Sequence, residues 1–326
     1  MTEMKKNIYE SIEDLVDKTP MPEETRQEIL RGLMRMRKNK LNLLITGATG
    51  CGKSSTINAM FDMEVAKVGV SVDPETMDIE KYELENMVIW DTPGLGDGAE
   101  ADRRHSNNIK NKLLELDSEG KPLIDLVLVI LDGSTRDLGT SYELINKVII
   151  PNLGDEASKR LLVAVNQADV AMKGGRHWDY ETNKPDAVLE KFLEEKCASI
   201  KRRIKEATGV DVEPIYYSAG FKEEGMQQAR PYNITKLFYY LLKNAPVEKR
   251  LALVENRNTD EEMWRDDDRK QDYKRGVVTT VRDTVVGAVA GAKIGGMIGS
   301  VAGPVGRAVG TVVGGIIGGI CGLFDW

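Results

Sequence analysis

The stretch GATGCGKS, residues 47–54, fits the phosphate-binding pattern G-x-x-x-x-G-K-S. It follows the apolar run LNLLIT and precedes the helical run SSTINAMF, a strand-loop-helix setting that disfavours a chance glycine turn. Glycines let backbone N–H groups surround phosphate oxygens, and the positive end of the following helix strengthens the attraction. We expect Lys53 to reach the terminal phosphates and Ser54 to coordinate Mg²⁺. The predicted phosphate-contact residues are Gly47, Ala48, Thr49, Gly50, Cys51, Gly52, Lys53, Ser54 and Ser55.

A second pattern, DTPG at residues 91–94, ends the apolar run MVIW. Asp91 can hold a metal ion through water there, and the Gly94 N–H can meet a γ-phosphate. The following segment LGDGAE would then respond to the bound nucleotide. Alone, DTPG is equally consistent with an ordinary turn, because Pro and Gly favour turns. Its position after a phosphate-binding loop favours the functional interpretation.

Between these two patterns lies GVSVDPETMDIEKYELEN, in which Thr76 follows a Pro and precedes an alternating run. Thr76 is the candidate for a threonine that contacts Mg²⁺ and the γ-phosphate only when a triphosphate is bound. The alternative is an ordinary threonine at a strand edge. The predicted metal contacts are Ser54, Thr76 and Asp91, and the predicted catalytic contacts are Lys53, Thr76 and Gly94.

A third pattern, NQAD at residues 166–169, follows the strand-like run LLVAV and suits recognition of guanine. Asp169 could accept hydrogen bonds from N1–H and the exocyclic amine of guanine, a donor pair that adenine does not present. Asn166 would tie this loop to neighbouring segments, and a backbone N–H of SAG, residues 218–220, could meet guanine O6. The alternative for NQAD is a capped turn. The predicted base-side residues are Asn166, Gln167, Asp169, Ser218 and Ala219.

Taken in order, GATGCGKS, Thr76, DTPG, NQAD and SAG resemble the five motifs of the translation-factor-related GTPases. GVSVDPET followed by VIWDTPGLGD is most similar to the Era-like GTPases, especially prophage-type members, with septins and interferon-inducible GTPases as more distant likenesses. The resemblance covers about residues 40–244. It implies a Ras-like fold, binding of GTP and GDP with Mg²⁺, and hydrolysis of GTP to GDP and phosphate.

Two residues depart from the pattern of these GTPases. Gln167 stands where the family has a lysine whose stem lies over the base, so the resemblance implies weaker binding, with guanine specificity kept by Asp169. Leu95 follows DTPG where Ras-type enzymes have a glutamine that orients the attacking water. Another group or a partner must then position the water. Because positioning and charge stabilisation carry most of phosphoryl transfer, we expect slow intrinsic turnover.

The elements that must position these residues are predicted by alternating strand-like and helical runs. The β-rich runs LNLLIT, MVIWD, LIDLVLVILD, RLLVAVN and VEPIYYS alternate with helical stretches at 53–61, 104–117 and 185–207. This order predicts an α/β fold with a mostly parallel sheet covered on both faces. The predicted divisions are two N-terminal helices within 1–38, a GTPase domain at 39–246, a charged and solvated helical linker at 247–276, and a glycine-rich apolar hairpin at 277–326.

Residues 277–326 contain two runs of five glycines at a spacing of four. That spacing aligns small residues on one helix face, as in closely packed membrane helices. We therefore predict a glycine-zipper helical hairpin, broken near Pro304, that associates with a membrane. Lys293 and Arg307 argue against two clean membrane spans. The alternatives are folding back on the GTPase domain and packing against further copies of the chain.

Composition narrows the partners and the compartment. The chain of 326 residues has a net charge of −7, yet the segment from Arg269 to the end has seven basic and three acidic residues. The acidic remainder makes nucleic acid a poor partner, whereas the basic, apolar tail suits an anionic membrane surface. Three widely spaced cysteines, with no apolar leader in MTEMKKNIYE, indicate a cytoplasmic protein, or one at the cytoplasmic face of a membrane.

Two function classes stay open. The first is a GTP-hydrolysing switch whose tail engages a membrane or a partner. The second is a membrane-inserting or self-assembling effector that the GTPase domain only regulates. A ribosome-associated role is disfavoured, because the chain shows no basic patch or RNA-binding appendage.

Overall fold

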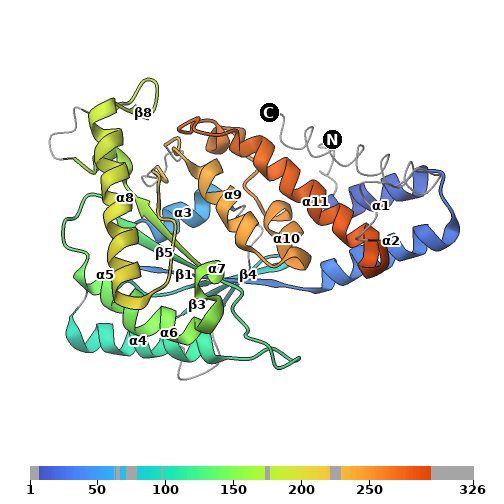
Figure 1. Cartoon of the computed structure of the whole chain (residues 1–326), viewed down its shortest axis with the longest axis horizontal. Helices are drawn as coiled ribbons and strands as arrows, with labels where there is room; N and C mark the ends of the chain where they lie inside the picture. The colour runs from blue at the N-terminus through green and yellow to red at the C-terminus, as the bar shows by residue number, and fades with distance from the viewer. Residues whose placement is uncertain are drawn as a thin grey trace.

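The computed structural model gives the arrangement of most of the chain (Figure 1). It describes residues 7–61, 63, 67–70, 79–96, 98–172, 177–220 and 229–294. Thr76 and most of the glycine-rich tail, residues 295–326, lie outside this described part. The predicted contacts of Thr76 and the second arm of the predicted hairpin therefore stay predictions.

A seven-stranded sheet lies at the centre, in the order β2-β3-β4-β1-β5-β6-β9. Its parallel strands are β1 (Leu41–Gly47), β4 (Met87–Asp91), β5 (Leu126–Asp132), β6 (Leu161–Asn166) and β9 (Ile215–Tyr216). An antiparallel edge is formed by β2 (Lys67–Val70) and β3 (Glu80–Glu83). Every residue of β1, β4 and β6 is buried, as expected of parallel strands covered on both faces. The predicted α/β fold with a mostly parallel sheet is confirmed.

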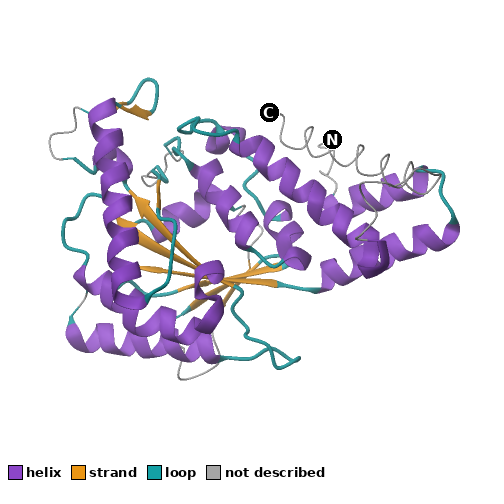
Figure 2. Ribbon diagram, in the orientation of Figure 1, coloured by secondary structure: helices purple, strands orange, loops and turns teal. Residues whose placement is uncertain are grey.

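Helices cover both faces of this sheet (Figure 2). One face carries α1 (Ile8–Lys18), α2 (Glu23–Lys38), α3 (Lys53–Met60), α9 (Ile234–Asn244), α10 (Arg250–Glu255) and α11 (Tyr273–Ile294). The other carries α4 (Ala99–Leu114), α5 (Gly139–Glu143), the π-helix η2 (Leu144–Ile149), α6 (Ile150–Leu153), α7 (Ala157–Arg160) and α8 (Ala187–Thr208). Successive residues of β1 point to opposite faces, so Leu43 packs in the first core and Leu44 in the second.

The predicted helices exist, but some of their ends differ. The two N-terminal helices are α1 and α2, as expected. α4 begins at Ala99 rather than at residue 104, and the Asp102 carboxylate in its first turn accepts a hydrogen bond from the Gly96 N–H at 2.8 Å. α8 begins after Asp186, whose side chain caps the first N–H groups of the helix. Such caps depend on single contacts that hydrophobic periodicity does not report.

Residues 247–276 do not form the solvated linker that their charge predicted. Residues 251–254 in α10 are fully buried among α1, α9, α11 and β1. Trp264, in the short 3-10 helix η6 (Glu261–Trp264), meets the Phe238 ring edge to face at a centroid distance of 5.1 Å. The prediction was wrong about the short apolar run LALV, because a count of charged residues over the whole segment does not show which residues face the core.

α11 crosses the boundary that was predicted at residue 277. It packs against α2 and α9 and buries Val277, Val281 and Val285, which are spaced by four and lie on one helix face. The beginning of the tail therefore folds back on the domain, one of the alternatives left open by the sequence. Among the residues that the structure describes, none of the helices combines the length and the apolarity needed to cross a bilayer.

Candidate nucleotide-binding site

The phosphate loop, residues 47–52, joins β1 to α3 in a conformation that suits glycine. Gly50 and Gly52 have φ angles of 77° and 89°, in the left-handed region. A Cβ atom at Gly52 would lie 2.1 Å from Asn166 Nδ2, so a larger residue would displace that side chain. The N-cap residue of α3 is Gly52, which has no side chain to cap the helix, and the N-terminus of a helix attracts anions. Lys53 Nζ donates to the Ala48 carbonyl at 3.4 Å, so the predicted phosphate-binding amine already lies along this loop.

Asp91 brings a buried carboxylate to the end of β4. Its backbone lies in register with Ile45 of β1, two residues before the phosphate loop. Asp91 is 9% exposed, and its Oδ1 has no hydrogen-bond partner among the described residues. Burial raises the pKa of Asp91 to about 6, while the Lys53 charge acts to lower the pKa and Glu80 to raise it. A buried oxygen without a donor suits a hydrated cation. Ser54, the predicted second oxygen ligand, lies exposed on the first turn of α3.

The DTPG segment lies directly against the phosphate loop. The Thr49 N–H donates to the Leu95 carbonyl at 2.9 Å, and the Leu95 N–H donates to the Gly47 carbonyl at 3.2 Å. A Cβ atom at Gly94 would lie 2.2 Å from Thr49 Oγ1, so this close approach requires glycine. Leu95 itself is buried and apolar, so its side chain cannot orient a water molecule. Gly94 and Leu95 are therefore packed directly against the phosphate loop.

Asn166 joins the phosphate loop to the base-side loops through one buried amide. Its Nδ2 donates to the Cys51 carbonyl at 2.9 Å, and its Oδ1 accepts from the Ala219 N–H at 2.9 Å. Asn166 ends β6, and the parallel order β1-β5-β6-β9 brings the carboxyl ends of these strands to one edge. The three segments at that edge are thus held in a fixed relation.

Asp169 and Gln167, two of the predicted base-side residues, follow β6 at the same edge. Asp169 Oδ1 accepts a hydrogen bond from Ser218 Oγ at 2.7 Å, which orients the carboxylate. Gln167 adopts a left-handed conformation, with φ of 59°, and its Nε2 donates to the Gly50 carbonyl at 2.8 Å. Gln167 stands where the GTPases that this sequence resembles have a lysine. Its hydrogen bond therefore supports the phosphate loop.

Cys51 contributes its backbone rather than its thiol to the site. The side chain is fully buried, and burial raises the pKa of the thiol to about 11 although the nearby Lys53 charge opposes that shift. A thiol with such a pKa stays protonated and unreactive at neutral pH.

Two supporting contacts had no signal in the sequence. Thr56 Oγ1 and the Tyr217 hydroxyl are 2.6 Å apart in the core and join α3 to the segment after β9. Lys196 of α8 donates to the carbonyls of Gly133 and Thr135, the latter at 2.7 Å, and so holds the loop after β5 beside the base-side residues. Both contacts join residues far apart in the chain, and neither pair belongs to a local motif.

The sequence is similar to those of known proteins over part of its length. Residues 42–167 match the family described as "50S ribosome-binding GTPase". The chain is 28% identical over 149 residues to the uncharacterized protein YfjP of Escherichia coli, covering 44% of this chain and 47% of that protein. It is 26% identical over 167 residues to Translocase of chloroplast 34 of Pisum sativum, covering 50% and 52%. It is 25% identical over 126 residues to the probable GTP-binding protein EngB of Methanococcus aeolicus, covering 34% and 53%.

The chain spans about half the length of these three relatives, and only 14% of Translocase of chloroplast 126 of Physcomitrium patens. Solved structures with some likeness include Toc33 from Arabidopsis thaliana in complex with Mg²⁺ and GMPPNP, at 16% identity and a TM-score of 0.39 over 67% of this chain and 88% of that chain. The LeoA bacterial dynamin GTPase has 15% identity and a TM-score of 0.39 over 86% and 46%. From the sequence matches and the phosphate loop within them, residues 42–167 of this chain belong to a P-loop GTPase domain.

Proposed function

We propose that this protein binds GTP and GDP with Mg²⁺ and hydrolyses GTP to GDP and phosphate as a slow molecular switch. The observation that carries the proposal is the buried Asn166 amide, which bonds the phosphate loop on one side and the base-side loop on the other. A nucleotide placed at this edge would meet phosphate-binding and guanine-binding groups that are already held together. Such preorganisation lowers the ordering cost of binding.

The residues divide into phosphate, metal and base roles. Backbone N–H groups of the phosphate loop and the Lys53 amine would bind the β- and γ-phosphates. Ser54 would hold Mg²⁺ directly, and Asp91 through water, with Thr76 as a further ligand in the triphosphate state. Bound Mg²⁺ would neutralise charge that develops on the phosphate oxygens during transfer.

Slow turnover follows from the residue after DTPG. The attacking water needs a polar group that orients it, and Leu95 supplies none because its side chain is apolar and buried. The Gly94 N–H would still meet the γ-phosphate. We infer that a partner or a segment outside the described residues supplies the missing group.

Guanine selection would depend on Asp169. Its carboxylate is oriented by Ser218 Oγ, which leaves lone pairs for N1–H and the exocyclic amine of guanine. The Ala219 N–H already donates to Asn166, so this residue holds the loop in place, and another N–H of that loop would have to reach O6.

Nucleotide binding by the full chain tests this proposal. We expect fluorescent GTP and GDP to bind in the presence of Mg²⁺ and to be weakened by EDTA, with ATP about 100-fold weaker or more. Phosphate release should proceed at about 10⁻⁴ to 10⁻² s⁻¹ without a partner. Equal affinities for ATP and GTP, or binding that ignores Mg²⁺, would contradict the assignment.

We further infer that the tail beyond α11 is the output element and engages a membrane. Support comes from the glycine spacing and basic charge of the sequence, and α11 provides the connection to the domain. Flotation with phosphatidylcholine vesicles, with and without phosphatidylserine, should recover the full chain but not a chain that ends at Ile294. A recovered fraction that changes with bound nucleotide supports the switch, whereas a nucleotide-independent fraction favours the effector alternative. If the full chain does not float with vesicles in any nucleotide state, the membrane assignment is wrong, and the tail would instead bind a protein partner or a second copy of the chain.

A further inference from the structure

The base-side loop is paired with the segment that precedes α9. The Ser218 N–H donates to the Tyr232 carbonyl at 3.0 Å, and the Tyr232 N–H donates to the Ser218 carbonyl at 2.8 Å. Gly220 has a φ of 68°, and a Cβ atom there would lie 2.1 Å from the Ala229 carbonyl oxygen. Because Ser218 also bonds Asp169, a chain of hydrogen bonds runs from Asp169 through Ser218 to Tyr232.

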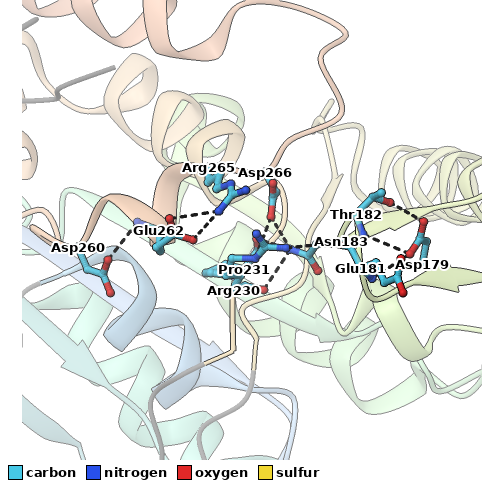
Figure 3. Close-up of polar contacts among 10 residues, drawn as sticks. All are labelled: Asp179, Glu181, Thr182, Asn183, Arg230, Pro231, Asp260, Glu262, Arg265 and Asp266. Atoms are coloured by element: carbon cyan, nitrogen blue, oxygen red, sulfur yellow. Dashed lines mark hydrogen bonds and ion pairs between the residues drawn. The ribbon is translucent and has the colours of Figure 1, made fainter.

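That segment is tied to the chain that leads into α11. Figure 3 shows Asn183, Arg230 and Asp266 pointing toward one another from three separate segments. Asn183 Nδ2 donates to Asp266 Oδ2 at 3.0 Å and to the Pro231 carbonyl at 3.0 Å. Arg230 Nε lies 3.5 Å from Asp266 Oδ2, and the Asp266 side chain is only 11% exposed. The neighbouring Arg265 instead pairs with Glu262 at 3.0 Å, within its own segment.

Asn233 adds a buried connection beneath this cluster. It has a φ of 59° and no exposed surface. Its N–H donates to the Asp266 carbonyl at 2.9 Å, and its Oδ1 accepts from the Asp268 N–H at 2.8 Å. Its Nδ2 donates to the Tyr216 carbonyl of β9 at 3.0 Å. One side chain therefore bonds both the strand before the base-side loop and the connector between α10 and α11, residues 256–272.

Asp268 continues the connection into the first residue of α11. Its side chain is fully buried, forms an ion pair with Lys236 at 2.6 Å and accepts from the Tyr273 hydroxyl at 2.8 Å. Burial alone would raise the pKa of Asp268, but the hydrogen bonds from Lys236 and Tyr273 and the Lys236 charge outweigh it, so the pKa lies below its ordinary value. Lys236 lies on α9, so separating this ion pair would leave a buried charge without compensation. Asp268 therefore bonds α9 through Lys236 and α11 through the Tyr273 hydroxyl.

From these contacts we propose that residues 265–273 act as a latch through which an occupied guanine pocket strengthens the docking of α11 on the domain. The proposal rests on the proposed function, since it takes Asp169 and the 218–220 loop as base contacts. GDP and GTP carry the same base, so both should tighten the latch to a similar degree. The γ-phosphate acts on the DTPG segment at the phosphate loop instead. The latch thus reports whether the site is filled, and by linkage a weakened latch also weakens nucleotide binding.

Hydrogen exchange of the full chain, without nucleotide, with GDP and with a non-hydrolysable GTP analogue, tests the latch. We expect both nucleotides to slow exchange about tenfold at amides of residues 273–285, to similar extents. Asp266→Ala should abolish this protection and weaken GDP binding about five- to tenfold. Glu262→Ala, which breaks the neighbouring ion pair within the connector, should leave both unchanged.

The outcomes separate the latch from the proposed function, because GDP affinity is measured independently by fluorescence. Bound GDP without protection of residues 273–285 overturns the latch alone, and so does protection by the GTP analogue only. Absence of nucleotide binding overturns both. If Asp266→Ala does not fold, the comparison of the unaltered chain without nucleotide, with GDP and with the GTP analogue still tests the latch.

Discussion

Replacing Lys53 by alanine is expected to weaken GTP and GDP binding by about 100- to 1,000-fold. The amine would form charge-assisted hydrogen bonds to the terminal phosphates, each contributing about 1.5–3 kcal/mol, and about 1.4 kcal/mol corresponds to a factor of ten in affinity. The fold should tolerate the change, because the contact of Lys53 with the Ala48 carbonyl is long, at 3.4 Å. Titration with a fluorescent guanine nucleotide in Mg²⁺ measures the effect.

The matched control is Lys191→Ala, in which an amine of the same charge is removed from a side chain that is 77% exposed on α8. Its nucleotide affinity should equal that of the unaltered chain. An equal loss in both variants would point to net charge rather than to phosphate binding. Full affinity in the Lys53 variant would remove the phosphate loop from the site.

Replacing Asp169 by asparagine is expected to change the preferred base from guanine to xanthine. Xanthine keeps the N1–H donor but carries a carbonyl in place of the exocyclic amine, and an asparagine offers one acceptor and one donor to match that pair. The Ser218 hydroxyl can still donate to the Oδ1 of the new side chain, so its orientation is retained. Guanine affinity should fall about 100- to 10,000-fold, because a buried polar pair would be left mismatched.

Competition between guanosine and xanthosine diphosphates for a fluorescent nucleotide measures this change. Asp155→Asn serves as the control, because Asp155 is exposed in the turn before α7 and its loss removes the same charge. Loss of guanine binding without a gain for xanthine would mean that Asp169 supports the loop rather than reading the base. Unchanged guanine preference would place base recognition elsewhere.

Much of the domain can be predicted from local patterns. The run LNLLIT and the following glycines specify β1 and the phosphate loop, because a buried strand and a left-handed turn each leave a signature in adjacent residues. DTPG was located for the same reason, and the structure places Gly94 against Thr49. The order of strands and helices also predicted the covered parallel sheet.

The segment before α11 shows where such patterns fail. Its charge predicted a solvated linker, yet residues 251–254 are buried and Asp268 forms a buried ion pair with Lys236. A carboxylate can be buried only where a partner compensates its charge, and that partner lies on α9, 32 residues earlier in the chain. A prediction made from one segment alone does not include the residue that compensates its buried charge.

The sequence by itself predicted which groups would be available for phosphate, metal and guanine, because the residues of each motif are adjacent in the chain and their chemistry is local. Only the tertiary structure decided how the motifs meet. The Asn166 amide reaches Cys51 across 115 residues and Ala219 across 53. Those contacts depend on the strand order β1-β5-β6-β9, which is set by packing of the whole sheet. The same packing, and not the glycine spacing, places the first turns of α11 on the domain and joins them to the base-side loops.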